Sequence, residues 1–182
     1  MFFEKPGPEN TKQTLKAAFE RGRDLELNEA VFATTTGETA YKAMEIFSGF
    51  RLIAVTYHGG FREPFENVMA TDVRRDLESK GVTVISATHA LSGVERSIAK
   101  KHSGLYPVLL IADTLKRFGQ GTKVAVEVSI MAADAGVLTG KDIVAVGGSA
   151  KGADTALVLA PANQSNFFDM KIKEIVCKPR NF

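Results

Sequence analysis

The sequence lacks most of the residue patterns that mark metal sites and covalent catalysis. It has a single cysteine, Cys177, which excludes an internal disulfide and, without a second thiolate nearby, a cysteine metal site. Its three histidines stand at positions 58, 89 and 102, far from the spacing of HxH or HExxH zinc motifs. Neither a GxSxG turn nor a Cys/His pairing is present, so covalent hydrolase chemistry has no support. We therefore expect no metal centre.

Charge of one sign and long apolar runs are also scarce. The net charge is only +2, and acidic residues interrupt every cluster of Lys and Arg, which argues against a nucleic-acid partner. No segment approaches the ~20 apolar residues of a membrane span, and the amino terminus, MFFEKPGPEN, has no signal-peptide core. We expect a cytoplasmic protein with no membrane partner.

What is present is an alternation of short apolar runs and amphipathic segments over 182 residues, enough for one domain spanning 1–182. The segment 123–136 combines a strand-like first half with a helical second half, and we interpret it as a helix. The other periodic segments divide as follows: helices over 10–24, 38–47, 71–80, 95–102 and 105–118, and strands over 29–33, 51–56, 82–86, 142–146, 155–159 and 171–178. This order predicts an α/β fold, a three-layer αβα sandwich with a mostly parallel sheet.

Ligands of open parallel sheets bind beyond the carboxyl ends of the strands, where the strand order reverses. We expect the strands Glu29 to Ala33 and Asp142 to Val146 to lie at the centre, with the switch point between them. The loops that follow the strands at Ala33, Thr56, Ser86 and Val146 are therefore the candidate binding loops.

The first of these loops, ATTTGETA, has a composition that suits a phosphate. Gly37 allows close backbone approach, and the unpaired N–H groups of a helix start favour an anion. Thr34, Thr35, Thr36 and Thr39 add hydroxyl donors. The alternative is a threonine-rich helix start that binds nothing.

A second loop, GGSAKGAD over 147–154, is also rich in glycine. It lacks the GxGxxG spacing and precedes a strand, which makes a nicotinamide site improbable. Gly147 and Gly148 could bring the backbone close to a ligand, and Lys151 could add charge. The alternative is a tight turn between two strands.

Two histidines follow predicted strands. His58 lies in the long segment 57–70, whose aromatic content argues against disorder, and His89 follows the strand that ends at Ser86. Both imidazoles could meet at one rim and bind a ligand or exchange protons near neutral pH. Structural or solvated histidines are the alternative interpretation.

The order strand, TTTGETA, helix, RLIAVTY, and later GVLTGKDIVAVGG and TALVL resembles the C-terminal domain of pyruvate kinase. In allosteric kinases the turn matching Thr34 to Thr39 holds a phosphate of a sugar bisphosphate, and the loop matching Gly148 to Asp154 closes over it. A basic residue often found in that turn is Glu38 here, and an acid would repel a doubly charged sugar phosphate. The chain lacks the kinase's catalytic barrel, so pyruvate kinase activity is not expected.

Across nearly its whole length the chain is similar to a family of small stand-alone pyruvate kinase α/β domain proteins. The segments KPGPENT, TTTGETA, VTYHGGF, LSGVERSI, VSIMAADAG, GGSAKGADTA and NFFDMKIKEI carry that likeness. Members resemble flavin mononucleotide (FMN) binders without an established reaction, so the resemblance implies an FMN-binding protein, with a flavin-dependent oxidoreductase as one option.

The binding residues expected from both lines of reasoning are Thr34, Thr35, Thr36, Gly37, Glu38, Thr39, Thr56, Tyr57, His58, Gly59, Phe61, Met69, His89, Leu91, Ser92, Gly147 and Gly148. The apolar flavin ring would rest among Tyr57, Phe61, Met69 and Leu91. The alternative function is a non-enzymatic sensor that binds a phosphorylated sugar or another metabolite. The sequence is compatible with a homo-oligomer but does not determine the oligomeric state.

Overall fold

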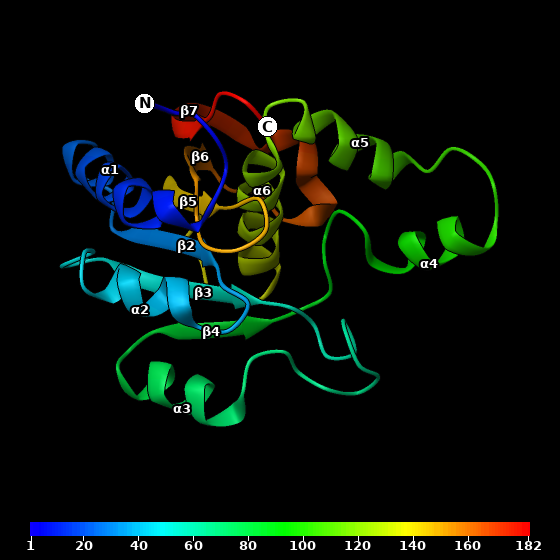
Figure 1. Cartoon of the computed structure of the whole chain (residues 1–182), viewed down its shortest axis with the longest axis horizontal. Coiled ribbons are helices and arrows are strands. Elements are labelled where there is room, and N and C mark those ends of the chain that lie inside the picture. Colours follow the sequence, from blue (N-terminus) through cyan, green and yellow to red (C-terminus); the bar gives the residue numbers. More distant parts are fainter.

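The computed structural model describes residues 1–182 and contains one seven-stranded sheet (Figure 1). Its strand order is β1-β7-β6-β5-β2-β3-β4. Every strand runs in the same direction except β6, which is antiparallel to both of its neighbours. The strands are β1 (Phe2–Phe3), β2 (Glu29–Ala33), β3 (Arg51–Thr56), β4 (Thr83–Ser86), β5 (Ile143–Gly147), β6 (Thr155–Ala160) and β7 (Lys171–Pro179).

Helices cover both faces of the sheet because the central strands are apolar on both sides. In β2, Ala30 and Phe32 pack into one hydrophobic core while Val31 packs into the other. The first core includes residues of α1 (Thr11–Asp24), α2 (Glu38–Met44) and α3 (Thr71–Ser79). The second includes residues of α5 (Pro107–Lys116) and α6 (Gln120–Asp134). The predicted three-layer architecture and mostly parallel sheet are thus confirmed.

The central position of β2 and β5 is also as predicted. Val31 lies beside Ala145 on one side and beside Ile53 on the other, so the strand order reverses between β2 and β5. The carboxyl ends of β2, β3, β4 and β5 consequently open on one edge of the sheet. The direction of β6 has a simple cause: the loop of residues 148–154 is too short for a crossover, so the chain turns back beside β5.

Element boundaries differ slightly from those predicted. The helix expected over 38–47 ends at Met44, and Ile46 and Phe47 both donate to the carbonyl of Ala43 in a tighter turn. Strand β1 was not predicted, because two residues carry no periodic signal and their partner β7 is at the other end of the chain. Two 3-10 helices, η1 (Pro8–Asn10) and η2 (Gln164–Asp169), complete the elements. None of the helices has the length and apolar content needed to cross a membrane.

One part of the chain projects from this compact body. Helices α4 (Gly93–Lys101) and α5 form a hairpin that extends away from the sheet (Figure 1). Helix α5 packs on α6, whereas α4 packs on α5 and has no buried residue. We call residues 93–116 the arm.

Candidate functional site at the carboxyl edge of the sheet

The turn after β2, residues 34–37, is stabilised from inside by threonine side chains. The N–H of Gly37 donates to Oγ1 of Thr34 at 3.1 Å, and the hydroxyl of Thr56 donates to the carbonyl of Thr35 at 3.0 Å. Thr34, Thr39 and Thr56 are all buried. The hydroxyls of Thr34 and Thr56 therefore shape the turn, whereas the sequence had led us to expect free threonine donors for a ligand. The hydroxyl of Thr39 makes no hydrogen bond within the chain but belongs to a buried residue.

Gly37 is required by the backbone of this turn. Its φ of 95° lies in the left-handed region, which disfavours other residues. A Cβ at this position would lie 2.7 Å from Cγ1 of Val73 on α3. The glycine thus serves the turn and its packing against α3, which is a different reason from the predicted close approach to an anion.

The main-chain donors of the same turn are unpaired. The N–H groups of Thr35, Thr36, Glu38, Thr39 and Ala40 make no hydrogen bond within the chain, and the helical ladder of α2 starts with Tyr41 donating to Gly37. Two of the five, those of Thr35 and Thr36, precede the helix itself. A short stretch with five unpaired donors at the end of a central strand is a suitable cradle for an anion.

The charges around the turn are balanced. Glu38 forms an ion pair with Lys42 at 2.6 Å, and this hydrogen bond lowers the pKa of the Glu38 carboxyl below its ordinary value. Lys151, on the loop after β5, lowers that pKa further through its charge. The repulsion expected from Glu38 is therefore offset by two cations, and the loops after β2 and β5 lie near one another.

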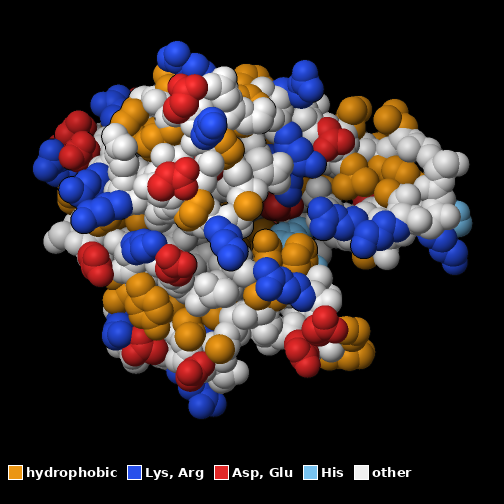
Figure 2. Space-filling model, viewed as in Figure 1, with side chains coloured by type: hydrophobic (Ala, Val, Ile, Leu, Met, Phe, Trp, Pro, Cys, Tyr) orange, Lys and Arg blue, Asp and Glu red, His pale blue; other side chains and the backbone are white.

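Four rings gather beside the turn, directly after β3 and β4. Tyr57 and Phe61 stack with their centroids 3.9 Å apart. The centroids of His58 and His89 are 5.2 Å apart, and Phe61 lies 5.0 Å from His89. Figure 2 shows histidine side chains near the centre of this face, with Lys and Arg side chains on several sides of them. The structure thus brings both predicted histidines to one rim.

The surroundings of His89 favour its neutral form. Burial lowers the pKa of His89 below its ordinary value of 6.5, with smaller contributions in the same direction from the charges of Lys123, His58 and Arg96. The carboxylate of Glu127 acts in the opposite direction. A neutral imidazole can accept or donate a hydrogen bond at neutral pH.

A buried ion pair on α6 lies behind this ring cluster. Lys123 and Glu127 form a salt bridge with both side chains less than a tenth exposed, and the Leu91 N–H donates to Oε1 of Glu127 at 3.0 Å. Burial lowers the pKa of the Lys123 ammonium, and Glu127 opposes this shift. Sequence reasoning missed the pair. Its signal is a Lys and a Glu four residues apart inside the otherwise apolar run KVAVEV.

The remaining predicted wall residues lie apart from one another. Met69 is buried in the core that contains α1 to α3, whereas Leu91 is buried in the core on the opposite face of the sheet. Ser92 is buried beside Leu91, and Gly59 is exposed on the loop after β3. The predicted ring site of Tyr57, Phe61, Met69 and Leu91 therefore reduces to the two aromatic rings, which the histidines join.

The glycine-rich loop after β5 is held by contacts with the rest of the chain, although the N–H groups of Gly148, Ala150, Lys151 and Gly152 make no hydrogen bond. A Cβ on Gly147 would lie 2.3 Å from the carbonyl oxygen of Gly121 on α6, and one on Gly148 would lie 2.3 Å from that of Gly152. Asp154 accepts hydrogen bonds from the N–H and hydroxyl of Ser149 and from the hydroxyl of Thr155. These glycines accommodate internal packing, and the tight-turn alternative describes them.

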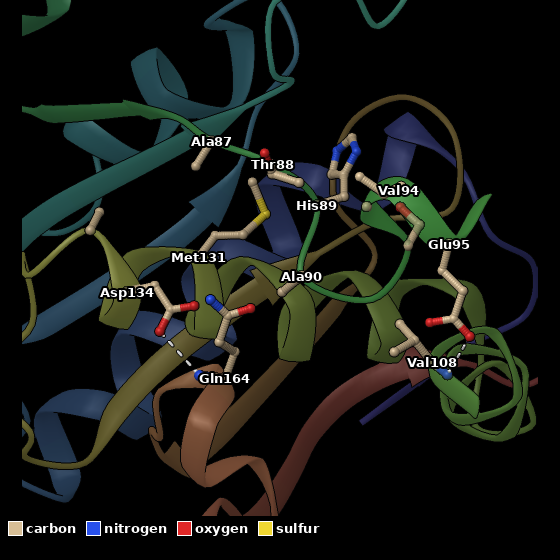
Figure 3. A pocket seen from close by; sticks show the side chains of 13 residues that line it. Ala87, Thr88, His89, Ala90, Val94, Glu95, Val108, Met131, Asp134 and Gln164 are labelled. Carbon is tan, nitrogen blue, oxygen red and sulfur yellow. Dashed lines mark hydrogen bonds between the residues drawn. The ribbon is translucent and has the colours of Figure 1, made fainter. Parts of the chain in front are cut away.

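A hollow of about 470 Å³ lies on the α6 side of the ring cluster (Figure 3). Thr88, Ser92, Glu95, Asp134 and Gln164 contribute polar atoms to its lining. Its apolar lining residues include Ala87, Ala90, Val94, Val108 and Met131. It shares His89 and Ser92 with the predicted site but contains no residue of the threonine turn, so the turn is a surface cradle outside this hollow.

Comparison with models of protein families shows to which family the chain belongs. The family model for the pyruvate kinase alpha/beta domain matches residues 12–159, from α1 to the end of β6. That range contains the threonine turn, the ring cluster, the Lys123–Glu127 pair and the loop after β5. Because the match covers most of the 182 residues, this chain belongs to the pyruvate kinase alpha/beta domain family.

Proposed function

We propose that the protein binds a phosphorylated ligand, FMN, at the carboxyl edge of the sheet, with the phosphate on the turn of residues 34–39. The observation that carries the proposal is the set of five unpaired N–H groups at Thr35, Thr36, Glu38, Thr39 and Ala40. Hydrogen bonds from N–H groups to a charged acceptor contribute about 1.5–3 kcal/mol each, so two or three of them would dominate the affinity for a phosphate.

These donors matter more than the dipole of the helix that follows. Helix α2 has only seven residues, so its dipole adds little. The nearby Lys151 supplies a positive charge that interacts with the turn, as its effect on the pKa of Glu38 indicates. Thr36, which is exposed, offers a hydroxyl without an internal partner.

The ring cluster supports a flat aromatic ligand. Tyr57 directly follows Thr56, whose hydroxyl is bonded to the carbonyl of Thr35, so the phosphate turn and the first ring are linked by one hydrogen bond. Stacked and edge-on aromatic contacts contribute about 0.5–1.5 kcal/mol beyond the area that they bury. In this proposal the isoalloxazine ring lies against Tyr57, Phe61 and His89, and the ribityl chain spans the distance to the turn.

A spectrum of the purified protein after incubation with FMN and removal of free flavin tests the proposal. We expect retained flavin absorption, and an increase in melting temperature with FMN, because a ligand that binds the folded chain stabilises it. A protein that stays colourless and is stabilised by sugar phosphates would instead identify the alternative, a sensor of a phosphorylated metabolite. The Glu38–Lys42 pair keeps that alternative chemically reasonable, since it neutralises the acid that would repel a sugar phosphate.

A further inference from the structure

The arm is poorly supported by the rest of the chain. Helix α4 has nine residues and none of them is buried, and the only buried residue of α5 is Ala112. Isolated helices shorter than about 12–15 residues are marginal in water, so helices of this size depend on packing. Helix α4 would therefore be stabilised by a further surface that packs on it.

Large apolar side chains are exposed along the arm. Val94 is 75% exposed and Leu105 is 78% exposed, and Ile98 and Leu110 are about half exposed. Val94 and Ile98 are four residues apart and share one face of α4. Figure 2 shows hydrophobic side chains on the surface of the arm, with Lys and Arg side chains next to them. We call these four residues the arm stripe.

A recess that could accommodate the arm stripe is present on the same chain. The hollow of about 470 Å³ is bounded by the arm at Val94 and Val108 and by the body at Ala90 and Met131, and Figure 3 shows these side chains around it. The exposed face of Val94 is continuous with the lining of the hollow. One molecule therefore presents both a projecting helix with exposed apolar residues and an open recess with a mixed apolar and polar lining, which is the condition for a self-complementary contact.

The charges of the two surfaces are complementary. Arg96, Lys100 and Lys101 on α4 take part in no salt bridge. At the rim of the hollow, the exposed Asp134 accepts hydrogen bonds from Asn163 and Gln164 but has no cationic partner. A basic helix that enters the recess would bring its cations to this carboxylate.

The surface of the chain is larger than that of a typical monomer. It exposes 9647 Å², whereas folded monomers of 19.6 kDa expose about 8,600 Å². The excess, on the order of 1,000 Å², is similar to the ~800 Å² that each partner buries in a standard-size interface.

We propose that the arm is a dimerisation element, and that the arm stripe of one copy packs in the hollow of a second copy around a two-fold axis. Dimers of this symmetry bury the same pair of surfaces twice. The inference is independent of FMN binding. It also gives the arm a role at the site edge, because α4 begins four residues after His89 and a docked partner would fix the loop between them.

Sedimentation velocity over a range of concentrations tests the proposal. We expect a dimer for the unmodified chain, and a monomer for the double variant Val94→Asp/Ile98→Asp, whose substituted positions are exposed. Leu25→Asp is the matched control, because Leu25 is an exposed apolar residue that follows α1 and lies outside the arm. This variant should stay dimeric. A monomeric unmodified chain, or a double variant that dimerises as well as the control, would overturn the proposal.

Disulfide trapping tests directly whether the arm of one copy lies in the hollow of the other. Burial raises the pKa of Cys177 to about 11, so the native chain contributes no reactive thiol. A mixture of Ile98→Cys chains with Ala135→Cys chains should form a mixed disulfide dimer on mild oxidation, because Ala135 lines the hollow. Each single variant alone should cross-link less. Equal cross-linking in the mixture and in the separate variants would contradict the placement of the arm in the hollow.

Discussion

The loops after β2 and β5 both contain glycine and lie at the same edge of the sheet, yet they differ in what they leave free. In the loop after β5, Asp154 accepts bonds from Ser149 and Thr155, and the N–H of Ala153 donates to Thr11. The turn after β2 leaves five N–H groups without an acceptor. The loop after β5 is therefore held by internal contacts, although the N–H groups of Gly148, Ala150, Lys151 and Gly152 also lack an acceptor. The turn after β2 has five such groups next to a helix start, which makes it the better cradle for an anion.

This difference shows what glycine content can and cannot reveal. Glycine allows two backbones to approach, but the partner can be another part of the same chain, as Gly121 is for Gly147. The contacts that a loop makes inside the chain, together with its unpaired donors, are needed to judge which of two such loops can bind an anion. Both loops have the composition of a phosphate site and both have unpaired N–H groups, but those of the turn after β2 lie at the start of a helix that follows a central parallel strand.

Among the substitutions that test this comparison, we expect Gly147→Ala to have the largest effect, a loss of stability. The added Cβ would lie 2.3 Å from the carbonyl oxygen of Gly121 and 2.7 Å from the nitrogen of Ala125, so β5 and α6 would have to separate. We expect a loss of about 3 kcal/mol in the free energy of unfolding, the upper end of the usual cost of overpacking, measured by urea denaturation. Gly59→Ala, where the nearest atom is a flexible side-chain oxygen at 3.4 Å, should change it little. Equal stability of the two variants would mean that the loop after β5 is not held by packing.

A smaller effect is expected at the open turn. Thr36 is exposed and makes no hydrogen bond, so Thr36→Glu adds a negative charge without disturbing the fold. We expect at least a tenfold loss of FMN affinity in a fluorescence titration, because a unit charge near a phosphate costs about 1–4 kcal/mol. Thr36→Gln, of the same size, should bind nearly as well as the native chain. If the two variants lost affinity equally, shape and not charge would govern this position.

The smallest effect concerns the pH dependence of stability at the ring cluster. The pKa of His89 is lower in the folded chain than its ordinary value of 6.5, so below that pH the unfolded chain binds more protons. Stability should therefore fall as the pH drops through 6.5 toward the folded pKa. Urea denaturation at pH 7.5 and 5.5 should show a smaller decrease for His89→Asn than for the native chain. The exposed His102→Asn serves as the control, and a decrease in His89→Asn that matched this control would refute burial of His89 as the cause.

The sequence predicted the fold well because the fold depends on periodic patterns. Runs such as RLIAVT and DIVAVG specify strands that are apolar on both faces, and helices alternate with them. The strand β1 and the reversal of β6 are the exceptions. The first depends on a partner at the far end of the chain, and the second on the length of a loop.

The site was predicted less well, because its details depend on contacts between distant segments. The histidines were placed together correctly from their positions after two strands. Met69 and Leu91 were expected on one wall, but the side from which each enters the core is fixed by tertiary packing. The Lys123–Glu127 pair was missed, since two charges in an apolar helix resemble a solvated edge until the helix is seen to be buried.

The central claim is that the turn after β2 binds the phosphate, and the most direct test is a calorimetric comparison of FMN with riboflavin on the native chain. The two ligands share the flavin ring and the ribityl chain and differ only in the phosphate. Two charge-assisted hydrogen bonds of about 1.5–3 kcal/mol each predict that FMN binds at least tenfold more tightly. Equal affinity for the two ligands would contradict a phosphate site at residues 34–39.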